Sequence, residues 1–283
     1  MGKKGCKKVI KGCKERVSKD FFISGYMDDA LVSTIDNIAE TVNKFIAKGG
    51  RILDFGAGPC DKTAVISCMG YECYAYDDLG DDWVKQNGYI DKIRMFASRY
   101  DIKLSIAHEG YLPFNNNTFD MVMSHDVLEH LHDSPREVFN DLVELIKPGG
   151  YLFVTVPNAV NVRKRIRVLL GKTNMADFGS YYWYPDPWRG HVREYVRNDL
   201  ELFSSYLGLE IVCLRGCDHM LHRVPRELRW GYKALTRWLD GWKDSWMLVA
   251  KKPKDWKSKR NLSKEEFYLT QAKTSPFYSR KLS

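Results

Sequence analysis

The segment Arg51-Ile-Leu-Asp-Phe-Gly-Ala-Gly58 decides the fold of this chain. Its apolar residues indicate a short buried strand, and its two glycines indicate a tight turn at the end of that strand. Residues 62–69 are expected to form the helix that follows the turn. Glycines at such a turn let the backbone approach a ligand closely. The segment therefore predicts a cofactor site at the end of a strand.

The alternation of strand and helix continues on both sides of this segment. Apolar residues between 28 and 48 recur at three- and four-residue steps, which indicates a helix that Gly49-Gly50 ends. Further strands are expected at 73–76, 103–107, 119–124, 151–156, 209–214 and 246–250, with helices at 82–100, 134–147 and 199–207. This order predicts an α/β fold: a doubly wound, Rossmann-like, mostly parallel seven-stranded sheet with helices on both faces.

The positive charge of the chain is concentrated at its two ends. Residues 1–20 carry +6 and residues 251–283 carry +7 of a total of +8, so the body between them carries −5. A duplex-binding groove would place positive charge on the body, so nucleic acid is not the expected partner. Basic ends suit weak attraction to an anionic membrane surface. We expect a flexible basic arm, one folded domain and a basic tail, at residues 1–24, 25–252 and 253–283.

Two insertions are expected late in the domain. Residues 158–190 are first basic and then aromatic, and a loop of this length in a compact domain is usually functional, so we interpret it as a lid. Residues 223–242 form a second, helical insertion that is also aromatic and basic. Recognition of the substrate is expected to depend on these two segments.

The glycine turn argues against a dinucleotide cofactor. A dinucleotide-binding turn would have a third glycine at position 61, where this chain has Asp61. The carboxylate would repel a pyrophosphate at the helix N-terminus. The second strand ends in Asp77-Asp78, where an acid can accept hydrogen bonds from ribose hydroxyls, although acids are also frequent in plain turns. A cofactor with a ribose but without phosphates fits these residues.

The most specific motif is Leu112-Pro-Phe-Asn-Asn-Asn-Thr-Phe-Asp-Met-Val-Met-Ser-His-Asp-Val-Leu-Glu-His-Leu131, followed by Lys147-Pro-Gly-Gly-Tyr-Leu-Phe-Val-Thr-Val-Pro157. With these segments and the glycine turn, residues 30–250 closely resemble the class I S-adenosylmethionine-dependent methyltransferases. The resemblance is to the small-molecule branch, which includes ubiquinone-type and sugar O-methyltransferases. It implies S-adenosylmethionine as the cofactor and methyl transfer as the activity.

The resemblance also implies a set of cofactor-binding positions. The first motif would line the methionine and ribose portions, and Asp77 takes the ribose-binding place. His108 and Glu109 stand where the family usually has Asp-Ala beside the adenine, and His125 should face the methyl-transfer site because ligands in such folds bind at carboxyl ends of strands. The complete expected set is Asp54, Phe55, Gly56, Ala57, Gly58, Asp77, Asp78, His108, Glu109 and His125.

His191 is the candidate catalytic base. It lies in Gly190-His-Val-Arg-Glu-Tyr195, where related small-molecule O-methyltransferases carry a histidine near the acceptor. The alternative, a histidine that packs the insertion against the body, stays open. Glu129-His130 is interpreted as structural, and Cys213, Cys217, His219 and His222 match no zinc spacing, so no metal site is predicted.

The acceptor is expected to be a sugar, a glycan or a related small-molecule hydroxyl, with a lipid or nucleotide attached as a further option. This expectation comes from the resemblance of residues 158–171 and 190–195 to methyltransferases of polysaccharide and lipid-linked glycan assembly. Two alternatives stay open: RNA or protein methylation through the basic tails, and a non-catalytic cofactor-binding scaffold. The chain has no apolar run that could span a bilayer and no signal-like segment, and we read its seven cysteines as reduced thiols. A cytoplasmic protein, peripheral at most at the membrane surface, is expected.

Overall fold

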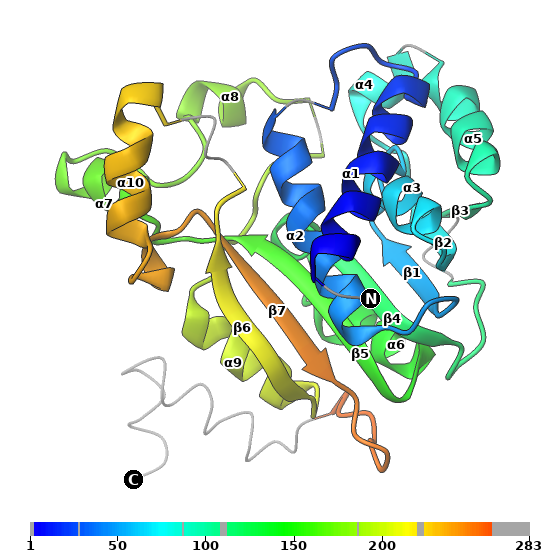
Figure 1. The fold of residues 1–283 in the computed structure, drawn as a ribbon. Coiled ribbons are helices and arrows are strands. Elements are labelled where there is room, and N and C mark those ends of the chain that lie inside the picture. Colours follow the sequence, from blue (N-terminus) through cyan, green and yellow to red (C-terminus); the bar gives the residue numbers. More distant parts are fainter. Residues whose placement is uncertain are drawn as a thin grey trace, which may run out of the picture.

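A seven-stranded sheet in the order β3-β2-β1-β4-β5-β7-β6 forms the centre of the molecule (Figure 1). The structure is a computed structural model that describes residues 3–27, 29–86, 88–107, 112–185, 187–219 and 224–261. Strands β1 to β5 pair in parallel, and β7 pairs antiparallel with both β5 and β6. The bounds are β1 Arg51–Phe55, β2 Glu72–Asp77, β3 Lys103–Ile106, β4 Phe119–His125, β5 Ile146–Pro157, β6 Glu210–Cys217 and β7 Ser245–Lys251. The predicted fold class is confirmed.

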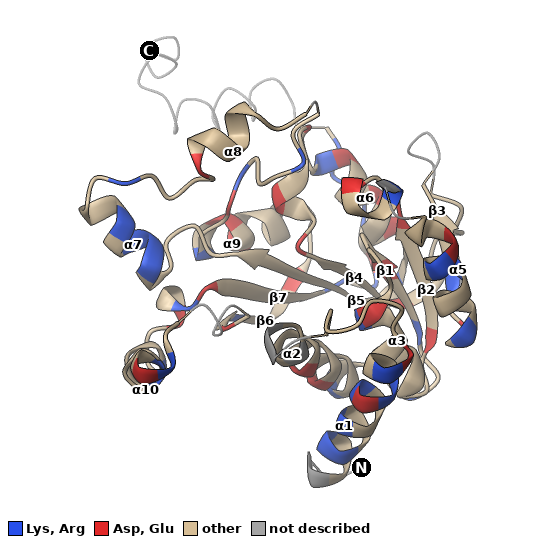
Figure 2. Ribbon diagram, turned by 90° about the horizontal axis from the view of Figure 1, so that it is seen from above, with Lys and Arg blue, Asp and Glu red and all other residues tan. Residues whose placement is uncertain are grey.

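Helices cover both faces of this sheet, as Figure 2 shows from above. One face carries α1, α2 and α3, and the opposite face carries α6 and α9. The helices are α1 Lys3–Asp20, α2 Asp29–Phe45, α3 Asp61–Cys68, α4 Asp82–Gln86, α5 Tyr89–Arg99, α6 Arg136–Leu145, α7 Val162–Leu169, α8 Phe178–Tyr182, α9 Arg197–Tyr206 and α10 Arg229–Thr236. Short 3-10 turns lie at Leu128–His130, Arg226–Leu228 and Asp240–Trp242.

Two separate apolar cores hold the layers together because successive side chains of a strand point to opposite faces. In β4, Met121 and Met123 belong to the core beneath α1, α2 and α3. Val122 belongs to the core beneath α6 and α9. All three side chains are fully buried, as expected for a sheet covered on both faces.

The predicted flexible arm over residues 1–24 is wrong for the described residues. Residues 3–20 form helix α1, whose Cys6, Ile10, Cys13 and Val17 are buried against the core of α2 and α3. These four residues recur at steps of three and four, the spacing of one helical face. Lys7, Lys8, Lys11 and Lys19 are exposed, and the high density of lysines in this segment concealed the apolar stripe in the sequence.

The predicted basic tail is also wrong at its start, because residues 252–261 pack against the domain. Lys252 is buried and donates to the Ile146 carbonyl at 2.7 Å. The Trp256 indole N–H donates to the Leu207 carbonyl at 2.6 Å, just after α9. Arg260 pairs with Asp141 at 2.6 Å and with Glu144 at 2.8 Å on α6. Residues 262–283 lie outside the described residues.

The first insertion forms two short helices rather than one long loop, and the second contains a helix, as expected. Residues 158–190 contain α7 and α8, and residues 223–242 contain α10. Helices α7 and α10 lie on the side of the molecule nearest β6 (Figures 1 and 2). No helix in the described part of the chain combines the length and apolar character that a membrane crossing requires.

The packing of α1 predicts that this helix stabilises the domain. Ile10 is 2% exposed, so Ile10→Ala should lower the free energy of unfolding by about 2–5 kcal/mol. Lys11→Ala on the exposed face is the matched control and should change it by less than about 0.5 kcal/mol. Urea denaturation followed by circular dichroism measures both. Equal unfolding midpoints for the two variants would contradict the packing of α1.

Candidate active site

The glycine turn joins the carboxyl ends of three neighbouring strands. Gly56 and Gly58 have φ angles of +76° and +53°, in the left-handed region that favours glycine. The Gly56 N–H donates to the Tyr76 carbonyl at 2.8 Å, which ties β1 to β2. A Cβ on Gly56 would lie 2.2 Å from Val127 Cγ2, just after β4. Only a glycine fits where these segments meet.

Asp77 holds the turn from the second strand. One carboxylate oxygen accepts the Gly58 N–H at 2.7 Å, and the other accepts the Leu79 N–H at 2.7 Å. Burial raises the pKa of Asp77, and these two backbone hydrogen bonds act against that rise. Each carboxylate oxygen has a second lone pair that remains available to a ribose hydroxyl.

A cavity of about 860 Å³ opens above this turn. It is lined by the ends of β1, β2 and β4, by the segment after β4, by the start of α6 and by the last part of the first insertion. A cleft at the carboxyl ends of parallel strands, at the point where the strand order reverses, is the usual ligand site of such sheets. The cavity therefore occupies the place that the sequence predicts for the cofactor.

Most of the predicted cofactor residues that the structure describes line this cavity. The lining includes Phe55, Gly56, Gly58, Asp77, Asp78 and His125. Ala57 and Asp54 are not among the lining residues: the buried Asp54 carboxylate instead accepts the Thr63 hydroxyl at 2.6 Å, which fixes α3 behind the turn. Burial raises the pKa of Asp54 to about 6. His108 and Glu109 lie outside the described residues.

His125 is buried at the end of β4. Its Nδ1 hydrogen-bonds with the Thr155 hydroxyl at 3.1 Å, and its ring packs edge-on against Phe153. Burial, followed by the charge of Lys62, holds the pKa of His125 well below its ordinary value. The ring is therefore neutral at pH 7. Its Nε2 is buried and has no hydrogen-bond partner among the residues that the structure describes.

The segment Pro187–Arg189 covers one side of the cavity, and sequence reasoning did not find the contacts that hold it there. Arg189 pairs with Asp78 at 3.0 Å and with Asp81 at 2.9 Å. On the opposite side, His132 Nε2 hydrogen-bonds with the Trp188 carbonyl at 2.6 Å. These contacts hold residues 187–189, called the cover below, against Asp78 and Asp81 on one side and His132 on the other. Because Asp78 and Arg189 are more than a hundred residues apart in sequence, no local pattern could have paired them.

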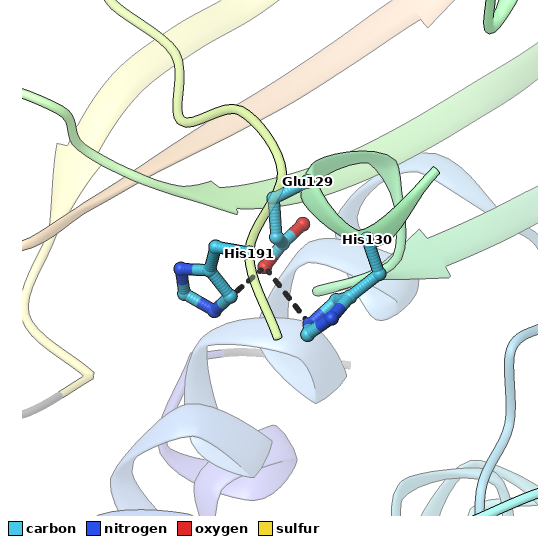
Figure 3. A group of neighbouring side chains, drawn as sticks. All are labelled: Glu129, His130 and His191. Atoms are coloured by element: carbon cyan, nitrogen blue, oxygen red, sulfur yellow. Dashed lines mark ion pairs between the residues drawn. The ribbon is translucent and has the colours of Figure 1, made fainter. Parts of the chain in front are cut away.

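A cluster of Glu129, His130 and His191 lies beside the cavity (Figure 3). Glu129 Oε1 lies 4.0 Å from the Nε2 atom of each histidine. His130 lines the cavity, whereas His191 is not a lining residue. Burial, followed by the charge of Asp126, raises the pKa of Glu129 to about 9, and burial followed by His130 lowers the pKa of His191 to about 4. Glu129-His130 was predicted to be structural and His191 to be a separate catalytic base, but the fold brings the three residues together.

The fold and this site define the class I S-adenosylmethionine-dependent methyltransferases. A parallel sheet with one antiparallel strand, β7, presents a glycine turn and a strand-end acid to one cavity. Asp61, in place of the third glycine, is fully buried in the first turn of α3, where a pyrophosphate would have to bind.

Comparison with known families agrees with this class. The family described as "Methyltransferase domain" matches residues 26–214, more than half of the chain, and the chain belongs to this family. It therefore carries a methyltransferase domain whose cofactor is S-adenosylmethionine.

Two curated relatives match parts of the chain. An uncharacterized methyltransferase of Schizosaccharomyces pombe is 30% identical over 122 residues, which cover 38% of this chain and 40% of the relative. A mitochondrial ubiquinone biosynthesis O-methyltransferase of Dictyostelium discoideum is 25% identical over 210 residues, which cover 68% of this chain and 59% of the relative. The matches thus span about half the length of these relatives.

Solved structures share the fold at low sequence identity. A chain from a Haloferax volcanii complex that contains the Trm112 methyltransferase activator has a TM-score of 0.55 at 14% identity, covering 87% of this chain and 97% of that one. An S-adenosylmethionine-dependent methyltransferase from Archaeoglobus fulgidus has a TM-score of 0.51 at 19% identity, covering 77% and 93%. These likenesses concern the fold alone.

The tight fit at Gly56 predicts a loss of cofactor binding on substitution. Gly56→Ala should weaken S-adenosylmethionine binding by about tenfold or more, because the new Cβ must push Val127 and the cavity wall away. Gly70→Ala is the control: Gly70 has a φ of +91° but open space around a Cβ. Isothermal titration calorimetry measures both affinities. Equal affinities for the two variants would contradict the assignment of the cavity.

The contacts of Arg189 predict that the cover slows release of the cofactor. Arg189→Ala removes both ion pairs, so the dissociation rate of S-adenosylmethionine should rise by about tenfold. Arg165→Ala on α7 is the control. It removes an arginine whose Nε–H donates a hydrogen bond to the Val160 carbonyl, and it should leave the dissociation rate unchanged. Stopped-flow fluorescence with excess competitor measures the rates. An unchanged rate in Arg189→Ala would show that the cover does not retain the ligand.

Proposed function

We propose that the protein transfers the methyl group of S-adenosylmethionine to a hydroxyl oxygen of a sugar, a glycan or a related small molecule. The observation that carries this proposal is the Glu129–His130–His191 cluster beside the cofactor cavity. An alcohol acceptor must lose its proton as the new bond forms, and imidazole nitrogens are the usual groups that manage such a proton. The relative from Dictyostelium, named as an O-methyltransferase, supports an oxygen acceptor.

The protein promotes this reaction mainly by aligning the acceptor oxygen with the methyl group and by excluding water. The acceptor oxygen attacks the methyl carbon in line with the sulfonium, the carbon–sulfur bond breaks, and S-adenosylhomocysteine leaves. The turn at Gly56 and the carboxylate of Asp77 would fix the donor. The cover at Trp188 and Arg189 would exclude water from the reacting atoms.

The insertions support an acceptor that carries a charged or apolar group. Helix α7 exposes Arg165 and Arg167, and guanidinium groups match phosphate in geometry. Basic residues colour much of α7 blue in Figure 2. Trp183, Trp230 and Trp238 are each more than 80% exposed, as is usual for side chains that meet a ligand or an interface. A lipid- or nucleotide-linked sugar offers a phosphate to the arginines.

An acceptor panel tests the proposed function directly. The full chain with S-adenosylmethionine labelled in its methyl group is mixed separately with sugars, lipid-linked and nucleotide-linked glycans, quinols, tRNA and peptides. Label is expected in an ether of a hydroxyl acceptor, located by mass spectrometry. Label in tRNA or in a peptide, with none in any hydroxyl compound, would contradict the proposal.

His191→Ala separates cofactor binding from turnover. Because His191 lies beside the cavity and not in its lining, the variant should bind S-adenosylmethionine with unchanged affinity. Its turnover with the acceptor found above should fall by about a hundredfold, the usual effect of losing a group that manages a proton. Glu15→Gln, at an exposed residue of α1 on neither insertion, is the control for turnover. Full activity of His191→Ala would remove this residue from the mechanism.

A further inference from the structure

Glu129 is buried with no described partner for either carboxylate oxygen. Its side chain is 0% exposed, and neither oxygen accepts or donates a hydrogen bond among the described residues. A buried carboxylate without hydrogen bonds is costly, so native proteins almost always provide a partner. The two histidine Nε2 atoms each lie 4.0 Å from Glu129 Oε1, which is too far for a hydrogen bond.

The hydrogen bonds of the two histidines show which ring nitrogen carries the proton and which carries the lone pair. His130 Nδ1 lies 2.7 Å from the Arg189 carbonyl, which can only accept, so Nδ1 carries the proton. His191 Nδ1 lies 2.9 Å from a carboxylate oxygen of Glu194 and donates in the same way. In the neutral tautomer with the proton on Nδ1, the unshared pair lies on Nε2. One ligand atom from each of Glu129, His130 and His191 lies within 4.8 Å of the other two (Figure 3).

Protonation of Glu129 would not give its carboxyl group a hydrogen bond to either histidine. The new O–H would still lie 4.0 Å from each possible acceptor nitrogen. Three electron-pair donors at this spacing call for a group that accepts electron pairs from all of them. A metal cation is the group with that property.

We propose that Glu129, His130 and His191 bind a divalent transition-metal cation. The three ligand atoms all lie within 4.8 Å of one another. Ligands about 2.1 Å from a zinc ion stand about 3–4 Å apart, so side-chain movements of under about 1 Å complete the site. Two imidazoles and one carboxylate favour zinc and its first-row neighbours over magnesium, which prefers oxygen ligands alone.

The surrounding groups are those that usually support a metal site. Metal-binding histidines commonly donate their second N–H to a carbonyl or a carboxylate, as His130 and His191 do here. Glu194, which orients His191, is itself paired with Lys164 from α7. The cation would thus join the segment after β4 to the end of the first insertion and hold the cover in place.

The site leaves room for a further ligand on the cavity side. The side chains of His130 and His191 are 37% and 38% exposed, and His130 lines the cofactor cavity. Resting on the proposed function, we assign this open position to the acceptor hydroxyl oxygen. In this arrangement the two imidazoles would assist loss of the proton through the cation rather than by accepting it: coordination would lower the pKa of the hydroxyl, its proton would leave to water, and the oxygen would take the methyl group as the carbon–sulfur bond breaks.

The experiment measures metal binding independently of activity. The full chain is treated with a chelator, desalted and titrated with Zn²⁺ by calorimetry and with Co²⁺ by visible absorption. One equivalent of each metal should bind, and Co²⁺ should give d–d bands. Glu129→Gln, which keeps the shape of the side chain, should weaken Zn²⁺ binding by about a hundredfold, and Glu194→Gln by about 10- to 100-fold.

Glu15→Gln is the matched control for metal binding, because it makes the same chemical change at an exposed residue of α1 outside the cluster. It should bind Zn²⁺ with the affinity of the unmodified chain. S-adenosylmethionine binding confirms that each variant is folded. Absence of metal binding, or equal Zn²⁺ affinity in folded Glu129→Gln and the unmodified chain, would overturn the proposal.

Methyl transfer before and after chelation separates this inference from the proposed function. Activity that is lost on chelation and restored by Zn²⁺ or Co²⁺ supports both. Full activity in metal-free protein overturns the metal site and leaves O-methylation intact. One bound equivalent of Zn²⁺ that Glu129→Gln abolishes, in a protein that methylates only tRNA or peptides, supports the site and overturns the proposed function.

Discussion

The close contact between the Gly56 turn and the segment after β4 is the constraint on which the site depends. A side chain at Gly56 would collide with Val127, so the backbone of β1 can approach that segment only through a glycine. The Gly58 N–H to Asp77 bond sets the distance between β1 and β2 at the same edge. The segment that meets Gly56 continues directly into Glu129 and His130. The donor site and the metal-ligand cluster are therefore positioned by one turn.

The sheet could be predicted from the sequence because its signals are local. Short apolar runs, glycine turns and helical spacing recur in the order that a doubly wound sheet requires, and all seven expected strands are present. The position of the cofactor cavity followed from the same pattern, because parallel strands place their carboxyl ends at one edge. The start of β5 at Ile146, before Pro148-Gly149-Gly150, was not expected: Ile146 pairs with Phe119 across an irregular register, which local sequence does not encode.

The features that the sequence did not reveal depend on contacts between distant segments. Helix α1 was concealed because lysines outnumber its four buried residues, and only the surface of α2 and α3 gives those residues a core. Arg189 pairs with Asp78, and Arg260 pairs with Asp141 of α6, although more than a hundred residues separate the partners in sequence. His191 could be found as a histidine near the acceptor, but its pairing with Glu129 requires the insertion to fold back over β4.

A crystal structure with S-adenosylhomocysteine and Zn²⁺, with anomalous data at the zinc edge, tests the central claim most directly. The account predicts ribose hydroxyls bonded to Asp77 and a sulfur that faces the cluster. It also predicts an anomalous peak among Glu129, His130 and His191, with room for an acceptor oxygen about 3–3.5 Å from the methyl position. Cofactor product bound outside the cavity above Gly56, or a sulfur turned away from that cluster, would contradict the account.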